Sequence, residues 1–212
     1  TTSEVTVDKE APTISSVAID ANNSILTLEF SEDVYSTANG SGDIATNDLS
    51  LSLTGGTAIL STHIPGSVSS IGNDKKTFNV VVSSIISGQV DGTEILKVEL
   101  APNSVFDKAG NIATIEQLNN TIQLKDKSKP SMTSLKLSSN NPFFTNLAKE
   151  NEEVTLTMVA DEEVTPPTVV FKSGNNDILN TTTVTVTPSD GTNTDYTAKY
   201  TVNASDINGS VS

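Results

Sequence analysis

Apolar and polar residues alternate with a period of two along most of this chain of 212 residues, and helical periodicity is hard to find. Such alternation places every second side chain on one face of a β-strand. Short alternating runs separated by turns rich in Gly, Asn and Asp are typical of β-sandwiches, so we predict an all-β protein. The residues expected in the core of its first half are Leu26, Leu28, Phe30, Phe78, Val80, Val82, Leu96, Val98 and Leu100.

Composition excludes several classes of protein. A net charge of −14 opposes binding to phosphate backbones, so we expect no nucleic-acid partner. The chain has no cysteine, which excludes disulfides and thiolate metal sites. No apolar run is long enough for a transmembrane helix, so no membrane span is expected in this segment. The start at Thr1, without an initiator Met or a signal peptide, suggests a mature or excised piece of a longer protein.

The chain also resembles itself at three places in the same order. Asp8–Pro12 recurs as Asp126–Pro130, an offset of 118 residues from Pro12 to Pro130. Leu28–Val34 recurs as Met158–Val164, and the Asp91-Gly92 turn matches Asn208-Gly209 at an offset of 117. These matches predict two tandem domains, residues 1–125 with an N-terminal linker at 1–11, and residues 126–212.

The first half contains three short motifs, Ala11–Ile14, Leu28–Val34 and Val105–Asn111. They resemble motifs of bacterial Ig-like repeat domains, which occur in tandem in large surface adhesins and other extracellular repeat proteins. The resemblance implies two tandem immunoglobulin-like β-sandwiches, a location outside the cell or at its surface, and neighbouring repeats of the same parent chain as partners.

The second domain is expected to be incomplete at its C-terminal end. By the match of the two Gly turns, the counterparts of Glu94–Leu100, Asp107–Asn111 and Thr121–Leu124 would follow Ser212. Two explanations are open. The parent chain continues beyond this sequence, or another subunit donates the missing strands, as in donor-strand assembly.

Acidic residues at loop ends form the candidate metal site. In the resembling modules the acidic pair after a strand, the Asp of the Ala-Gly-Asn loop and the linker Asp lie near a domain junction. These residues correspond here to Glu32, Asp33, Asp107 and Asp126, and their carboxylates would suit Ca²⁺. The alternative is that they are solvated loop charges, with Asp107 making local turn hydrogen bonds.

We expect no catalytic activity. The only histidine, His63, lies in a loop-like run without a nucleophile elbow, and the chain has no Trp for lining a sugar-cleaving cleft. The leading hypothesis is a structural spacer or stalk repeat of a secreted bacterial surface adhesin or extracellular filament. The alternatives are a ligand- or cell-binding Ig-like module, using the loop Tyr35–Asn47 or the insert Asn140–Asn151, and an accessory domain of a secreted hydrolase.

Overall fold

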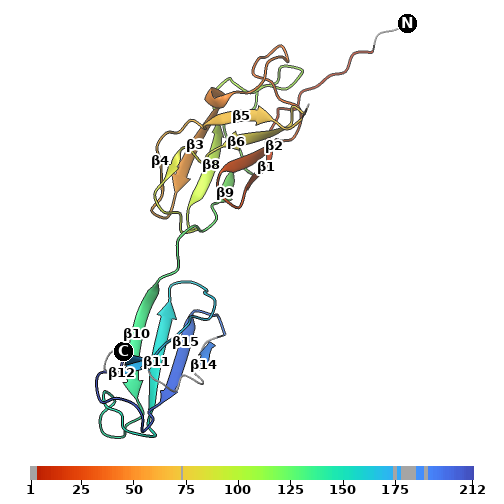
Figure 1. The fold of residues 1–212 in the computed structure, drawn as a ribbon. Helices are drawn as coiled ribbons and strands as arrows, with labels where there is room; N and C mark the ends of the chain where they lie inside the picture. The colour runs from red at the N-terminus through yellow and green to blue at the C-terminus, as the bar shows by residue number, and fades with distance from the viewer. Residues whose placement is uncertain (1–3, 73, 174–175, 178–184, 189–190) are drawn as a thin grey trace. The chain divides into compact units, whose positions relative to one another are not determined.

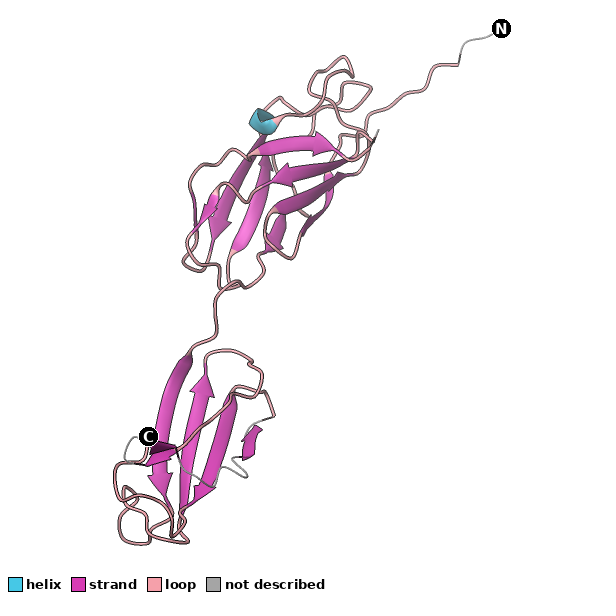
Figure 2. Ribbon diagram, in the orientation of Figure 1, coloured by secondary structure: helices cyan, strands magenta, loops and turns pink. Residues whose placement is uncertain are grey.

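The computed structural model describes residues 4–72, 74–173, 176–177, 185–188 and 191–212, and this part of the chain is all-β (Figures 1 and 2). Its one helical element is a short 3-10 turn, η1 (Thr46–Asp48). Across these residues, no helix has the length and apolarity needed to cross a membrane. The chain divides into two compact units, Thr1–Ser128 (unit 1) and Lys129–Ser212 (unit 2).

Unit 1 is a sandwich of two antiparallel sheets with strand orders β1-β2-β6-β5 and β3-β8-β9, and β4 pairs separately with β7 (Figure 1). The strands of the four-stranded sheet are β1 (Ile14–Ile19), β2 (Ile25–Phe30), β5 (Ser67–Ser70) and β6 (Thr77–Val81). The other strands are β3 (Leu49–Thr54), β4 (Ile59–Leu60), β7 (Ile86–Ser87), β8 (Ile95–Leu100) and β9 (Thr121–Gln123).

The core of unit 1 confirms the expected inward positions. All nine residues predicted from the alternation are no more than 4% exposed, and they belong to one contiguous apolar cluster from both sheets. Phe30 on β2 and Phe78 on β6 contact each other edge to face, with ring centroids 6.0 Å apart. Period-two patterning was sufficient here because each sheet buries only one of its two faces.

A buried carboxylate ties two loops of unit 1 together. Glu94, just before β8, is 0% exposed, and its Oε1 accepts hydrogen bonds from the backbone N–H groups of Thr57 and Ala58, each at 3.2 Å. Its Oε2 accepts from the N–H of Asp91 at 3.1 Å. Gly56 leaves room for this side chain, since a Cβ there would lie 2.0 Å from Oε1 and the Gly56 φ is +56°. Backbone N–H groups therefore satisfy both oxygens of this buried carboxyl group.

A second clamp holds the segment that leaves β9. Asn23, in the turn after β1, is 5% exposed and has a φ of +54°. Its Nδ2 donates to the carbonyl oxygen of Lys125 at 2.7 Å, and its Oδ1 accepts from the Lys125 N–H at 2.8 Å. The N–H of Lys127 donates to the Val90 carbonyl oxygen at 2.8 Å. These bonds keep residues 125–127 with unit 1, whereas the sequence placed the boundary directly after residue 125.

Unit 2 contains a four-stranded antiparallel sheet of order β10-β11-β15-β14 and a hairpin of β12 and β13. The strands of the sheet are β10 (Met132–Ser139), β11 (Glu153–Ala160), β14 (Thr185–Pro188) and β15 (Asp195–Thr201). The hairpin strands are β12 (Lys172–Ser173) and β13 (Asn176–Asp177). The buried apolar cluster of unit 2 is small and consists of Val154, Met158, Phe171, Tyr196, Ala198 and Tyr200.

The four-stranded sheets of the two units share their strand order and an irregularity. In each sheet the first two strands along the chain are neighbours. The last strand along the chain, β6 or β15, pairs with the second strand on one side and with the strand that precedes it, β5 or β14, on the other. The β1–β2 register shifts between Ile14 and Ser16, and the β10–β11 register shifts between Met132 and Ser134. The two shifts lie at positions 118 residues apart, the same offset as between the two Asp-Lys-x-x-Pro segments.

Candidate metal centre

The loop 107–111 folds around a fully buried carboxylate. Asp107 is 0% exposed, and its Oδ1 accepts from the backbone N–H of Asn111 at 2.7 Å, while Oδ2 accepts from Asn111 Nδ2 at 2.6 Å. Gly110 has a φ of +93°, and a Cβ there would lie 2.6 Å from the carbonyl oxygen of Ala38. The Ala-Gly-Asn sequence therefore provides both the tight turn and the polar partners of Asp107.

Antiparallel pairing brings Asp8 and Glu32 to this loop. Glu32 follows β2 and Asp8 precedes β1, and in an antiparallel pair the start of one strand lies beside the end of the other. The backbone N–H of Ser31 donates to the carbonyl oxygen of Thr13 at 2.8 Å and fixes this alignment. Carboxylate oxygens of Asp8, Glu32 and Asp107 lie within 4.8 Å of one another. We call this group the acidic triad.

Two members of the acidic triad have shifted pKa values, in opposite directions. Burial, followed by the charges of Asp107 and Asp8, raises the pKa of Glu32 above its ordinary 4.5. Burial also acts to raise the pKa of Asp107, but the hydrogen bonds from the Asn111 side chain and from backbone N–H groups outweigh it, and the pKa lies below 3.8. Asp107 is therefore held as a carboxylate. At Glu32, burial and the neighbouring negative charges both disfavour the ionised form.

The four residues predicted from the sequence are only partly brought together. Glu32 and Asp107 belong to the acidic triad, and the charge of Asp33 adds to the repulsion on Glu32. Asp126 lies at the opposite end of unit 1, beside Gly92, where its Oδ1 accepts from the N–H of Ser128 at 2.7 Å.

Sequence reasoning missed Asp8 as a member of the group. The signal that could have found Asp8 was the hairpin itself. A residue before β1 and one after β2 must share an end of the sheet, whereas Asp126 follows β9 and lies one strand length away.

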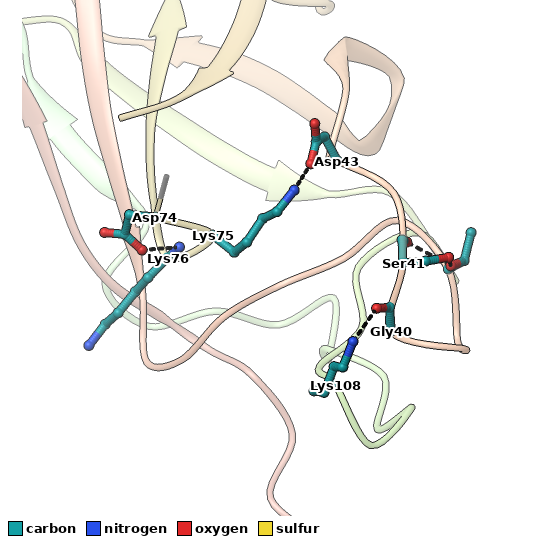
Figure 3. A network of polar contacts seen from close by, with 8 residues as sticks. Gly40, Ser41, Asp43, Asp74, Lys75, Lys76 and Lys108 are labelled. Carbon is teal, nitrogen blue, oxygen red and sulfur yellow. Dashed lines mark hydrogen bonds and ion pairs between the residues drawn. The ribbon is translucent and has the colours of Figure 1, made fainter. Parts of the chain in front are cut away.

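The long loop next to the triad is anchored by a lysine (Figure 3). Lys108 Nζ donates to the Gly40 carbonyl oxygen at 3.0 Å and lies 5.0 Å from the centre of the Tyr35 ring. Lys75 forms an ion pair with Asp43 from the same loop. Contacts at Gly40 and at Asp43 therefore hold the loop Tyr35–Asn47 in place. The Lys108 ammonium group points toward Gly40, although Lys108 is next to the buried Asp107 in the sequence.

The donor set of the triad suits a hard divalent cation. Ca²⁺ binds six to eight oxygens at 2.3–2.6 Å, so two oxygens on one ion are separated by no more than about 5 Å. The spacing within the triad meets this limit. Each carboxylate oxygen has more than one lone pair, so the hydrogen bonds from Asn111 leave Asp107 able to coordinate. A cation here would also offset the repulsion that raises the pKa of Glu32.

The triad predicts a pH-dependent stability in the absence of divalent cations. Because the pKa of Glu32 is raised on folding, its stabilising contribution is complete below about 4.5 and is lost as pH rises through the folded-state value. Glu32→Gln cannot ionise, so at about pH 7 this variant should be more stable than the wild type, by about 0.5 kcal/mol for a partly exposed group.

The measurement is urea unfolding in EDTA across the acid range. Below the ordinary pKa the two proteins should converge. Asp126→Asn, at the opposite end of unit 1, is the matched control and should not reproduce the gain of Glu32→Gln. Equal stability of Glu32→Gln and the wild type at neutral pH would contradict the repulsion among the three carboxylates.

No protein-family model, curated protein or solved structure significantly matches this chain. The resemblance to bacterial Ig-like repeats, drawn from short sequence motifs, therefore stays a prediction.

Proposed function

We propose that this chain is a non-catalytic structural spacer, a stalk segment of a secreted bacterial surface adhesin or extracellular filament. The observation that carries the proposal is the path of the chain through unit 1. Residues before Ile14 lie at the end of the sheet that holds the acidic triad, whereas the chain leaves beside Asn23, in the turn at the other end of β1. Units with such a path add length when joined in series.

The same path favours resistance to pulling. Force applied through the two ends of unit 1 runs along β1 and loads its ladder with β2 in shear, so the bonds from Ile14 to Ile19 share the load. At the far end, the paired hydrogen bonds between Asn23 and Lys125 hold the outgoing segment. The shared strand order and the register shifts at equivalent positions support a serial array of similar units.

A pulling experiment tests the spacer role. The chain has no cysteine, so each variant can carry two introduced cysteines as its only attachment points. Glu10→Cys with Lys129→Cys loads β1 in shear, whereas Glu10→Cys with Asp33→Cys pulls β1 and β2 apart from one end and breaks their bonds in sequence. We expect a clearly higher unfolding force for the first pair in single-molecule force spectroscopy. Equal forces for the two pairs would contradict a load-bearing role.

A second proposal is that Ca²⁺ binds the acidic triad and stiffens the start of unit 1. It is supported by the close approach of three carboxylates, one of them buried, on two loops and the N-terminal segment. Binding at this place would tie the segment before β1 to the sandwich. The residues that would hold the ion are Asp8, Glu32 and Asp107.

Calcium should raise the melting temperature of unit 1. Extracellular modules bind Ca²⁺ with Kd of about 10⁻⁴–10⁻³ M, so about 10 mM Ca²⁺ would stabilise by about 1.4–2.7 kcal/mol. Asp8→Asn should remove most of this gain, because it takes away one of the three carboxylates that would hold the ion. Asp8 is exposed, so the variant should still fold. Asp33→Asn is the matched control and should keep the gain. Identical melting in EDTA and in Ca²⁺ would rule out the site.

A further inference from the structure

Apolar residues of β10 are exposed on the face where unit 2 has its core. Leu135 is 64% exposed and Leu137 is 40% exposed. Leu135 pairs with Met158, which is 3% exposed, and Leu137 pairs with Leu156, which packs against the core. Directly opposite residues in an antiparallel pair lie on the same face. The inner face of the sheet is therefore open at β10.

In unit 1 the matching positions are partly buried. Val17 and Ile19 pair with Leu28 and Leu26, and both pack against the core. Their cover is the second sheet, in which β9 lies near β1 (Figure 1) and Ile122 packs on the same cluster. Val17 and Ile19 precede Leu135 and Leu137 by 118 residues, the offset found above.

The last residues of unit 2 begin a strand at the place where this cover would start. Val211 forms a β-bridge with Ser173, and the Ser212 N–H donates to the Lys172 carbonyl oxygen at 3.1 Å. The Lys172 N–H returns a hydrogen bond to the Ser212 carbonyl oxygen at 2.9 Å. Unit 1 has the same arrangement, because Thr54 at the end of β3 pairs with Ile95 at the start of β8.

An edge is available along which this strand could grow. Residues 168–171 precede β12 and lie in no strand of the described part of unit 2. Phe171 is buried and Val169 packs against the core, while Val170 between them is 52% exposed, so the segment alternates as a strand does. Pro166 and Pro167 have no N–H, which confines the ladder to residues 168–173. β3 likewise has six residues.

Beside this edge lies a cavity of about 660 Å³. Apolar side chains from β10, β11, the insert and the C-terminal segment line part of it, among them Leu137, Leu147, Val154 and Ile207. Leu147 is 57% exposed and Ile207 is 53% exposed. Ser173 and Val211 also line this cavity, so it lies where an added strand would begin.

We propose that unit 2 carries a strand-acceptor site, formed by residues 168–173 and the open face of β10. Its occupant is an extended segment joined directly after Ser212, with the alternation Leu-x-Val-x-Leu seen in β8. The first and third residues of such a segment would oppose Phe171 and Val169 and face the core. Attachment favours this occupant over a separate chain, because Val211 and Ser212 already place it in register and raise its effective concentration.

Fusing residues 96–124 of this sequence to Ser212 tests the site in the full chain. Hydrogen exchange of residues 132–139 and 168–173 should slow by about tenfold or more, and unit 2 should melt about 8 °C higher, while unit 1 serves as the internal reference. The matched control is the same extension with Ser in place of the appended copies of Leu96, Val98 and Leu100, and it should give neither effect. The appended sequence supplied as a free peptide forms a third arm.

Equal protection by the two extensions would overturn the proposal, because the apolar alternation would then have no part in it. So would an extension that leaves exchange in unit 2 unchanged. The free peptide could instead bind with micromolar affinity while the fused segment changes neither exchange nor melting. That result would show that another chain donates the strand and would overturn the proposed attachment to Ser212.

Discussion

Replacing Glu94 by alanine is expected to destabilise unit 1 by several kcal/mol, because each buried donor left without a partner costs about 1–3 kcal/mol. The side chain is fully buried and accepts three backbone N–H groups, from Asp91, Thr57 and Ala58. Alanine would leave the buried N–H of Ala58 without a partner, remove the acceptor of the part-buried N–H groups of Thr57 and Asp91, and leave a cavity where the carboxyl group was. Glu94→Gln should cost less, since its amide oxygen still accepts, but its NH₂ group would face a donor.

Urea unfolding of the full chain, read separately for each unit by hydrogen exchange with mass spectrometry, measures this effect. Glu99→Gln, on the strand β8 that follows Glu94, is the matched control. Its side chain is 43% exposed and pairs with Lys97 at 2.8 Å, so it should change stability by no more than about 0.5 kcal/mol. A Glu94→Ala protein as stable as this control would show that the two loops are held by other contacts.

Truncating Phe78 to alanine should destabilise unit 1 by about 3–5 kcal/mol. Phe78 is 0% exposed at the centre of the four-stranded sheet, so its removal leaves a cavity and also breaks the edge-to-face contact with Phe30. The same unfolding measurement applies. Leu118→Ala, at a site that is 95% exposed in the same unit, should change stability by no more than about 0.5 kcal/mol. Similar losses for the two variants would contradict the sandwich core described here.

The core could be predicted from the sequence because burial repeats with the strand period. Residues such as Leu28, Phe78 and Val98 were identified before any pairing was known, and all are 0% exposed. In unit 2, Leu135 pairs with the buried Met158 and is nevertheless 64% exposed. Burial there depends on a second layer, and local periodicity contains no information about that layer.

The candidate metal site was predictable in its chemistry and only partly in its membership. Acidic residues after strands pointed to Glu32 and Asp107, which do lie together. Asp126 was grouped with them because the resembling modules place a linker Asp near a domain junction, whereas here it lies beside Gly92 at the opposite end of unit 1. Asp8 has no counterpart in that motif set, although hairpin geometry places it beside Glu32. Short motifs identify residue types, whereas the end of a sheet that each loop occupies follows from counting strands.

The contact between Gly56 and Glu94 also has a consequence for how this sequence can change over time. Any side chain at position 56 would collide with the Glu94 carboxylate, and loss of that carboxylate removes the collision but not the preference of the φ of +56° for glycine. Neither substitution is favourable first, so the two positions should covary. In relatives of this unit, a residue with a Cβ at position 56 should accompany a shorter residue at position 94, and the pair should be inherited together.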